Sequence, residues 1–181
     1  MTTWIALFRG INVGGNNILK MADLRHELES LNCQHVRTYI QSGNVVFDST
    51  ARTAKSLVKK IERRIESQHG FRPRLFILSQ EELSEAIASN PFPQAVTKPS
   101  TLHFCFLEGT PVDPDIRAIE CAKAPSETYR LTERVFYLHA PDGIGRSKLA
   151  ANVEKHLGVA ATGRNYRTVD KLSSMVSQTE K

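Results

Sequence analysis

Two glycine-containing segments near the start of the chain carry the polar groups that commonly bind anions. RGINVGGNN spans residues 9–17 and QSGN spans residues 41–44. Glycine permits positive φ and close approach of the backbone to a ligand, and free N–H groups ahead of a helix favour an anion. The side chain of Lys20 adds positive charge. We therefore predict a site for a phosphorylated or other anionic small molecule, such as a nucleotide, contacted by Arg9, Asn12, Gly14, Gly15, Asn16, Asn17, Gln41, Ser42 and Asn44.

Neither segment matches an established nucleotide-binding fingerprint. The glycines at positions 10, 14 and 15 do not have the GxGxxG spacing, and no GK[ST] follows them. Turns that need glycine and asparagine for backbone geometry alone are the alternative interpretation.

Two further segments in the second half of the chain combine cations with a predicted helix start. Residues 142–148 read DGIGRSK and residues 163–168 read GRNYRT. The first segment could hold a phosphate, although Asp142 would repel it, or could simply be a helix-entry turn. The second suits phosphate contact with base stacking, or a surface tie to an acidic loop. The predicted contacts are Arg146, Ser147, Lys148, Arg164, Asn165 and Arg167.

Sequence patterns of established catalytic sites are absent. There is no HExxH and no GxSxG, and the six histidines are dispersed. Cys33, Cys105 and Cys121 are far apart, which predicts buried thiols in a reducing cytosol rather than disulfides or a zinc site. We predict no metal site, no cofactor and no specific catalytic residue, and whether the protein is an enzyme stays open.

Composition indicates an ordinary globular chain. It has 181 residues, 40% apolar and 24% charged, enough for one medium domain or two small ones. Neither a signal peptide nor an apolar run of the required length of about 20 residues is present, which predicts a cytoplasmic protein without a membrane segment. The net charge of +5 mildly favours anionic partners. The most basic stretch, residues 52–74, predicts a helix whose cations form either a solvated face or a nucleic-acid contact.

The order of predicted elements favours an α+β fold of two tandem ferredoxin-like plaits. A strand at 4–8, a helix at about 20–32, strands at 36–40 and 45–47, the basic helix and a strand at 73–78 give β-α-β-β-α-β. A capping box at 79–82 begins a connecting helix, and a proline-containing linker follows. The second series consists of strands at 101–107, 128–131, 135–139 and about 159–162, with helices from Asp113 to about 123 and at 147–157, and a C-terminal helix at about 167–176. The predicted parts are 1–79, 80–100, 101–176 and a tail at 177–181.

Four predicted strands are continuously apolar, including WIALF at 4–8 and VFYL at 135–138. Such strands predict sheets buried on both faces, by packing of one half against the other or of two copies in a homodimer. In the plait topology the first two polar segments also emerge at one end of the sheet, so we expect 9–17 and 41–44 to be neighbours.

Several motifs resemble a family of bacterial proteins of unknown function. They are RGINVGG at 9–15, MADLR at 21–25, TYIQSGNVVF at 38–47, NPFP at 90–93, GIGRSKL at 143–149 and RNYRTV at 164–169. The resemblance implies a pair of ferredoxin-like subdomains but no established activity, substrate or cofactor. Members usually carry Trp where Tyr166 stands, which keeps an aromatic ring.

Two other functions are compatible with the sequence. RNA-recognition modules share the predicted topology, but the third strand carries one aromatic residue, Phe47, and its sheet face is predicted to be buried. A single-stranded nucleic-acid partner is therefore an alternative to the small anion. A structural or dimerising role without any ligand is the third hypothesis.

Overall fold

The computed structural model describes residues 1–178, which form two compact units. Unit 1 comprises Met1–Glu85 together with the residues from Lys171 onward, and unit 2 comprises Ala86–Asp170. Each unit contains one four-stranded antiparallel sheet, so the chain has a mixed α+β fold. Of the predicted tail, Ser177 is the last residue of a helix, and residues 179–181 lie outside the described part of the chain.

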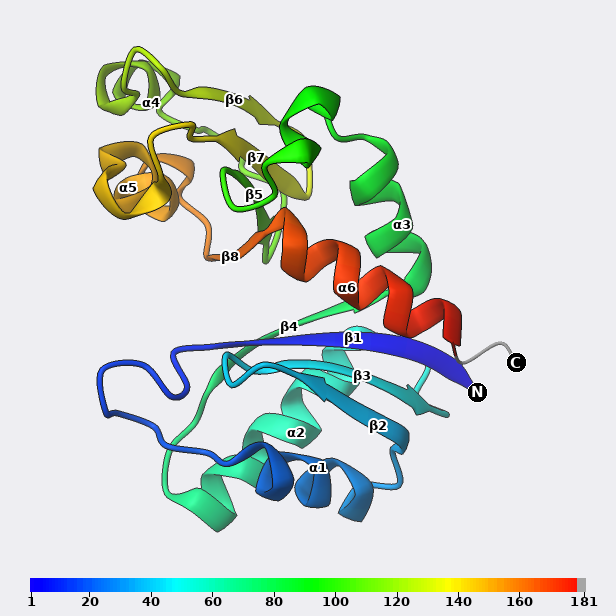
Figure 1. Cartoon of the computed structure of the whole chain (residues 1–181). Helices are drawn as coiled ribbons and strands as arrows, with labels where there is room; N and C mark the ends of the chain where they lie inside the picture. The colour runs from blue at the N-terminus through cyan, green and yellow to red at the C-terminus, as the bar shows by residue number, and fades with distance from the viewer. Residues whose placement is uncertain (179–181) are drawn as a thin grey trace. The chain divides into compact units, whose positions relative to one another are not determined.

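Unit 1 contains a sheet with the strand order β2-β3-β1-β4. Its elements are β1 (Thr2–Arg9), α1 (Met21–Ser30), β2 (Gln34–Tyr39), β3 (Asn44–Ser49), α2 (Ala54–His69) and β4 (Arg74–Ser79). Both helices lie on one face of the sheet (Figure 1). Trp4, Ala6 and Phe8 of β1 share one apolar core with Leu57 and Ile61 of α2. Every second residue of the strand therefore packs against residues spaced four apart on the helix.

Local sequence explains the bounds of α2. The Thr53 hydroxyl accepts a hydrogen bond from the Ser56 N–H and caps the first turn. Gly70, with φ 75°, ends the helix in the left-handed conformation that glycine adopts most readily. Arg64 and His69 of α2 both bind the buried Glu27 of α1, which fastens the two helices together.

Unit 2 repeats the same succession of elements, and its strand order is β6-β7-β5-β8. The elements are β5 (Leu102–Leu107), α4 (Ile116–Ala122), β6 (Thr128–Leu131), β7 (Val135–His139), α5 (Lys148–Leu157) and β8 (Ala161–Asn165), with short 3-10 helices η1 (Pro93–Thr97) and η2 (Ile144–Arg146). The predicted start of α4 at Asp113 is wrong, because Asp115 caps the helix by accepting the Ala118 N–H at 2.8 Å.

Two helices continue from one unit into the other. The predicted capping box at the start of α3 (Gln80–Ala88) is confirmed, since Glu82 Oε2 accepts the Ser79 N–H at 2.8 Å and Ser79 Oγ accepts the Glu82 N–H at 3.2 Å. The sequence assigns the C-terminal helix wholly to the second subdomain. In the structure α6 (Tyr166–Ser177) begins in unit 2, and its residues from Lys171 onward belong to unit 1.

The strands are buried on both faces, as their continuous apolar runs predict. In unit 1, Ile5 and Leu7 point away from the helix-covered face yet are 0% exposed, and the residues of α6 from Lys171 onward belong to this unit. In unit 2 the Tyr137 hydroxyl donates to the Ala86 carbonyl at 2.8 Å. The ring of Phe104 also lies 5.8 Å from that of Tyr166. Residues of α3 and α6 therefore cover the second face of this sheet.

Candidate functional site

The connection between β1 and α1 folds back on itself as a small hairpin. Val13 and Asn16 form an isolated antiparallel bridge, and the Asn16 N–H donates to the Val13 carbonyl at 3.1 Å. Gly14 and Gly15 lie between them with φ of 60° and 77°. Two successive positive φ values are the requirement of the mirror-image hairpin turn that Gly-Gly favours. The tip is therefore a defined turn, and both glycines are exposed.

Asn12 joins this loop to the β2–β3 hairpin. Its Oδ1 accepts the Leu19 N–H at 2.8 Å, and its Nδ2 donates to the carbonyls of Leu19 at 2.8 Å and Gln41 at 2.9 Å. The residue itself has φ 54°, which asparagine tolerates better than most residues. One side chain thus closes its own loop and holds the neighbouring one.

Gly43 brings the hairpin against the end of β1. Its carbonyl accepts the Phe8 N–H at 2.8 Å. It has φ 73°, and a Cβ added there would lie 2.5 Å from Phe8 Cβ. The predicted neighbourhood of 9–17 and 41–44 is thereby confirmed, and Figure 1 shows both connections at the end of the sheet where β4 begins.

The side-chain amides of several predicted contact residues form hydrogen bonds within the protein itself. Asn44 is 0% exposed, and its Nδ2 donates to the Tyr39 carbonyl and to Ser42 Oγ. Asn17 Nδ2 donates to the Gly10 carbonyl at 3.0 Å. Together with Asn12, these side chains build the loops. The exposed members of the set predicted at this end are Gly14, Gly15, Asn16, Asn17, Gln41 and Ser42. Among residues 1–178 the Gly14 and Gly15 N–H groups have no hydrogen-bond acceptor.

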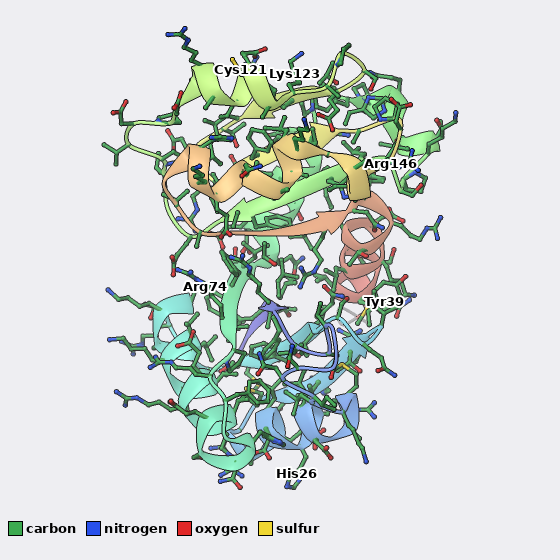
Figure 2. The ribbon with its side chains drawn as sticks, turned by 90° about the vertical axis from the view of Figure 1, so that its left-hand side faces the viewer. His26, Tyr39, Arg74, Cys121, Lys123 and Arg146 are labelled. Carbon is green, nitrogen blue, oxygen red and sulfur yellow. The ribbon has the colours of Figure 1, made fainter. Side chains whose placement is uncertain are left out.

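Arg74 belongs to the same end of the sheet and is absent from the predicted set. It is the first residue of β4 and lies directly opposite Arg9 in the antiparallel pair. Directly paired residues project from the same face of a sheet, so the register brings two arginines to one place at this end of unit 1. Figure 2 faces this end, with Arg74 at the β4 edge and Tyr39 at the β2 edge. The predicted topology already placed the turn before β4 beside the other two connections, so Arg74 could have been included in the prediction.

Apolar side chains accompany these cations. Val13, Ile18 and Ile40 are 64%, 68% and 53% exposed. Ile40 also has φ 48°, an outlying conformation for a β-branched residue. This end of unit 1 therefore presents guanidinium groups and uncovered aliphatic groups together.

The cationic segments of unit 2 meet at one end of its sheet. Leu102 pairs with His139 and His103 pairs with Asn165, so β7 and β8 finish at the same end. Residues 142–148 follow the first of these strands and residues 163–168 complete the second. Arg146, Lys148 and Arg167 are exposed (Arg146 is marked in Figure 2).

Polar groups in these two segments also serve local structure. Ser147 Oγ accepts the Ala150 N–H at 2.9 Å and caps α5, and Asn165 Oδ1 accepts the Thr168 N–H at 3.0 Å at the start of α6. Asp142 accepts the Ser126 hydroxyl. Arg164 donates to Thr162 Oγ1 and to the Gly163 carbonyl, both at 2.9 Å. Burial lowers the pKa of Arg164 to about 10, so a nearby anion would stabilise its charge.

The remaining chemistry-bearing groups are dispersed. Within residues 1–178, no three His, Cys, Asp or Glu side chains gather as metal ligands. All three cysteines are free thiols, and burial raises the pKa of Cys33 to about 11 and of Cys105 to about 12. Cys121 is exposed, so its predicted burial is wrong.

No helix in the described part of the chain is long and apolar enough to cross a membrane.

Comparison with known proteins identifies a family of unknown function and a similar solved structure. A family model described as protein of unknown function (DUF1697) matches residues 1–137. The structure of a conserved bacterial protein from Streptococcus pneumoniae is similar over 97% of this chain and 98% of that one, with a TM-score of 0.75 and 29% sequence identity. No curated protein matches the chain.

Proposed function

The chain belongs to the DUF1697 family of proteins of unknown function, and from its own residues we propose that the loop end of unit 1 binds an anionic small molecule with an apolar portion, such as a nucleotide. Arg9 and Arg74 supply the positive charge. The observation that carries the proposal is their placement directly opposite each other at a strand end. Two guanidinium groups at paired positions can contact one anion together through charge-assisted hydrogen bonds.

The surrounding connections support an anion. Residues 10–20, 40–43 and 70–73 contain no aspartate or glutamate, and Lys20 stands just before α1. The exposed N–H groups of Gly14 and Gly15 add hydrogen-bond donors. Asn12 and Asn44 have a scaffold role in this proposal, because they fix the two loops that carry the donors.

The exposed aliphatic groups support a nucleotide-like ligand over inorganic phosphate. Val13, Ile18 and Ile40 offer a surface on which a base or another apolar group can rest, and binding sites typically combine such contacts with a few polar ones. The single-stranded RNA alternative draws less support, since Ile5, Leu7 and Val46 of the second sheet face are buried.

Each unit is best classed as a ferredoxin-like plait. The β-α-β-β-α-β succession and the order β2-β3-β1-β4, repeated as β6-β7-β5-β8, support that assignment. Three free cysteines suit the cytoplasm, where thiols stay reduced. Unit 2 offers a second anion-binding candidate, in which Arg164 is the half-buried guanidinium and Arg146, Lys148 and Arg167 are exposed.

Isothermal titration with a panel of mono-, di- and triphosphate nucleotides, sugar phosphates and inorganic phosphate tests the proposal. We expect at least one nucleotide to bind, and Arg9→Gln/Arg74→Gln to weaken it by tenfold or more, since each charged hydrogen bond contributes about 1.5–3 kcal/mol. The matched control is Arg117→Gln/Arg130→Gln, which removes two exposed cations of unit 2.

Three outcomes contradict the proposal. The first is silence across the whole panel, and the second is equal weakening by the two double variants. The third is weakening by Arg146→Gln/Arg164→Gln alone, which would move the ligand to unit 2.

A further inference from the structure

The outer side of α2 carries a row of cations that the loop-end site does not use. Lys55, Lys59 and Arg63 follow one another at four-residue steps, Arg52 precedes them just before the helix, and all four are exposed. At 1.5 Å per residue the steps place a cation about every 6 Å along the axis. We call these four residues the α2 stripe.

The stripe lies opposite the side of α2 that packs in the core. Leu57, Ile61 and Ile65 are 3%, 0% and 0% exposed, and their helical positions are turned away from those of the stripe. Figure 2 shows nitrogen-tipped side chains projecting from α2 away from its sheet.

The arrangement is unfavourable for the helix itself. Like charges four residues apart repel, and a helix N-terminus favours acids, whereas the first turn of α2 has none and contains Lys55. A helix face that served only solubility would gain from an acid at one of these positions.

The two acids of α2, Glu62 and Glu66, both act on Arg72, and the exposed Glu66 follows the stripe three residues after Arg63. Glu62 is held by Arg72, whose Nε and Nη2 lie 3.0 and 2.8 Å from its Oε2. Arg64 is paired with Glu27, and Lys60 Nζ donates to the Leu31 carbonyl. Within residues 1–178, the four stripe cations make neither an ion pair nor a hydrogen bond.

We propose that the α2 stripe contacts the phosphate backbone of double-stranded nucleic acid without reading its sequence. Cations at regular steps along one side of a helix can each contact a phosphate of the backbone, and such contacts carry no sequence information. Helix α2 contains no Phe, Tyr or Trp for base stacking, which single-strand binding uses. The apolar side of α2 is occupied by the core, so the helix has none to insert into a membrane.

Fluorescence anisotropy with a labelled duplex of about 24 base pairs, titrated between roughly 50 and 200 mM salt, tests the proposal. The stripe variant is Lys55→Gln/Lys59→Gln/Arg63→Gln. If each side chain meets one phosphate, we expect the slope of log K against log salt to become shallower by about 2.7. Glutamine is a good helix former, so the fold should survive, which circular dichroism checks.

The control removes three exposed cations of unit 2 instead. Lys98→Gln/Arg117→Gln/Lys155→Gln changes the net charge equally, from +5 to +2 because three positive charges are lost, and should leave the slope within about 0.5 of the unmodified protein. Lys55→Arg/Lys59→Arg keeps the charges and should keep the slope. Arg9→Gln/Arg74→Gln should also keep it, so failure of the loop-end site and failure of the stripe are separately visible.

Four results would overturn the inference. One is an equal change of slope in both triple variants, and another is no duplex binding by the unmodified protein at 50 mM salt in roughly the 10⁻⁴ M range of non-specific binding. The third is tighter binding of a single strand of the same length. The fourth is stripe-dependent binding to phosphatidylserine vesicles without duplex binding, which would assign the surface to a membrane.

Discussion

The two units share one succession of elements and one strand order but carry their polar segments at opposite ends. In unit 1 the glycine-containing loop follows β1, and its partner is the hairpin between β2 and β3. In unit 2 the corresponding strands are β5, β6 and β7, whereas the cationic segments follow β7 and lie at the end of β8. The topology determines which loops are neighbours, and the loop sequences determine which chemical groups those neighbouring loops present.

The corresponding first connections have opposite electrostatic character. Unit 1 has RGINVGGNNILK after the body of β1, with cations and no acid. Unit 2 has EGTPVDPD at 108–115, which includes three acids and no cation. Asp115 of that segment caps α4, a structural task. The comparison therefore suggests that one end of unit 1 is specialised and that the same end of unit 2 is not.

Substitution of Gly43 gives the largest expected effect. In Gly43→Ala the new Cβ meets Phe8 Cβ at 2.5 Å and Ile11 Cδ1 at 2.7 Å at a φ of 73°. Overpacking and left-handed strain together should lower the free energy of unfolding by about 4 kcal/mol, measured by urea denaturation. The matched control is Gly109→Ala in the first connection of unit 2, where nothing lies within 4 Å of the added Cβ. Similar losses in the two variants would show that the close packing at Gly43 is unimportant.

Asn12→Ala should have the next largest effect. It removes three hydrogen bonds and leaves alanine at φ 54°, for an expected loss of about 2 kcal/mol in unfolding free energy. In unit 2, Asp115→Ala removes only a helix cap and should cost about 1 kcal/mol. Thermal and urea unfolding measure both. If Asp115→Ala proved the more damaging, the special role of the unit 1 loop would be refuted.

The two glycine loops should respond differently to asparagine. Gly143, with φ 94° and ψ 145°, is in a region that other residues rarely enter, so Gly143→Asn should lower stability by roughly 1–2 kcal/mol. Gly14, with φ 60° and open space around it, accepts asparagine at a loss of about 0.3 kcal/mol. Melting temperatures of the two variants provide the comparison, and equal shifts would contradict it.

The pH dependence should give the smallest difference between the units. Burial lowers the pKa of His103 in unit 2 below its ordinary 6.5, offset only in part by the bond to the Ser100 carbonyl. The unfolded chain then binds more protons, so stability is full above about pH 6.5 and falls as pH drops below it. His103→Gln should remove this decline in a series of melting temperatures.

Unit 1 should respond only at lower pH. Burial alone would raise the pKa of Asp48, but hydrogen bonds from Thr3 and His35 outweigh it and lower the pKa below the ordinary 3.8. Its contribution is complete above that value and is lost as pH falls through the folded-state pKa. Asp48→Asn should reduce the loss of stability at low pH and leave the decline below pH 6.5 unchanged. Any other pattern would show that Asp48 and His103 do not cause these two pH dependences.

Much of the architecture was predictable because local signals agree with tertiary packing. The apolar spacing of Leu57, Ile61 and Ile65 predicts the buried side of α2, and the Ser79–Glu82 pair predicts the start of α3. The start of α4 was predicted at Asp113, but Asp115, two residues later, caps the helix. The split of α6 between two units depends on which sheet each turn meets, which no local pattern encodes.

The candidate site was predictable in position but not in chemistry. Topology alone brings the segments around Asn12 and Gly43 together. Whether a side-chain amide faces solvent or a neighbouring carbonyl depends on atomic packing. The hydrogen bonds from Asn12, Asn17 and Asn44 to backbone carbonyls could therefore not be predicted from the sequence. Arg74 was missed although the turn before β4 was expected at the same end of the sheet, because its pairing with Arg9 follows only from the strand register.

The return of α6 to unit 1 affects the order in which a newly made chain can finish folding. Protein synthesis delivers residues from the N-terminus, so unit 2, complete at Asp170, leaves the ribosome before unit 1 receives its last helical turns. Leu172 and Val176, 0% and 4% exposed, are made only after every residue of unit 2. A chain truncated after Asp170 would thus leave the earlier-made unit unfinished and contain every residue of the later-made one.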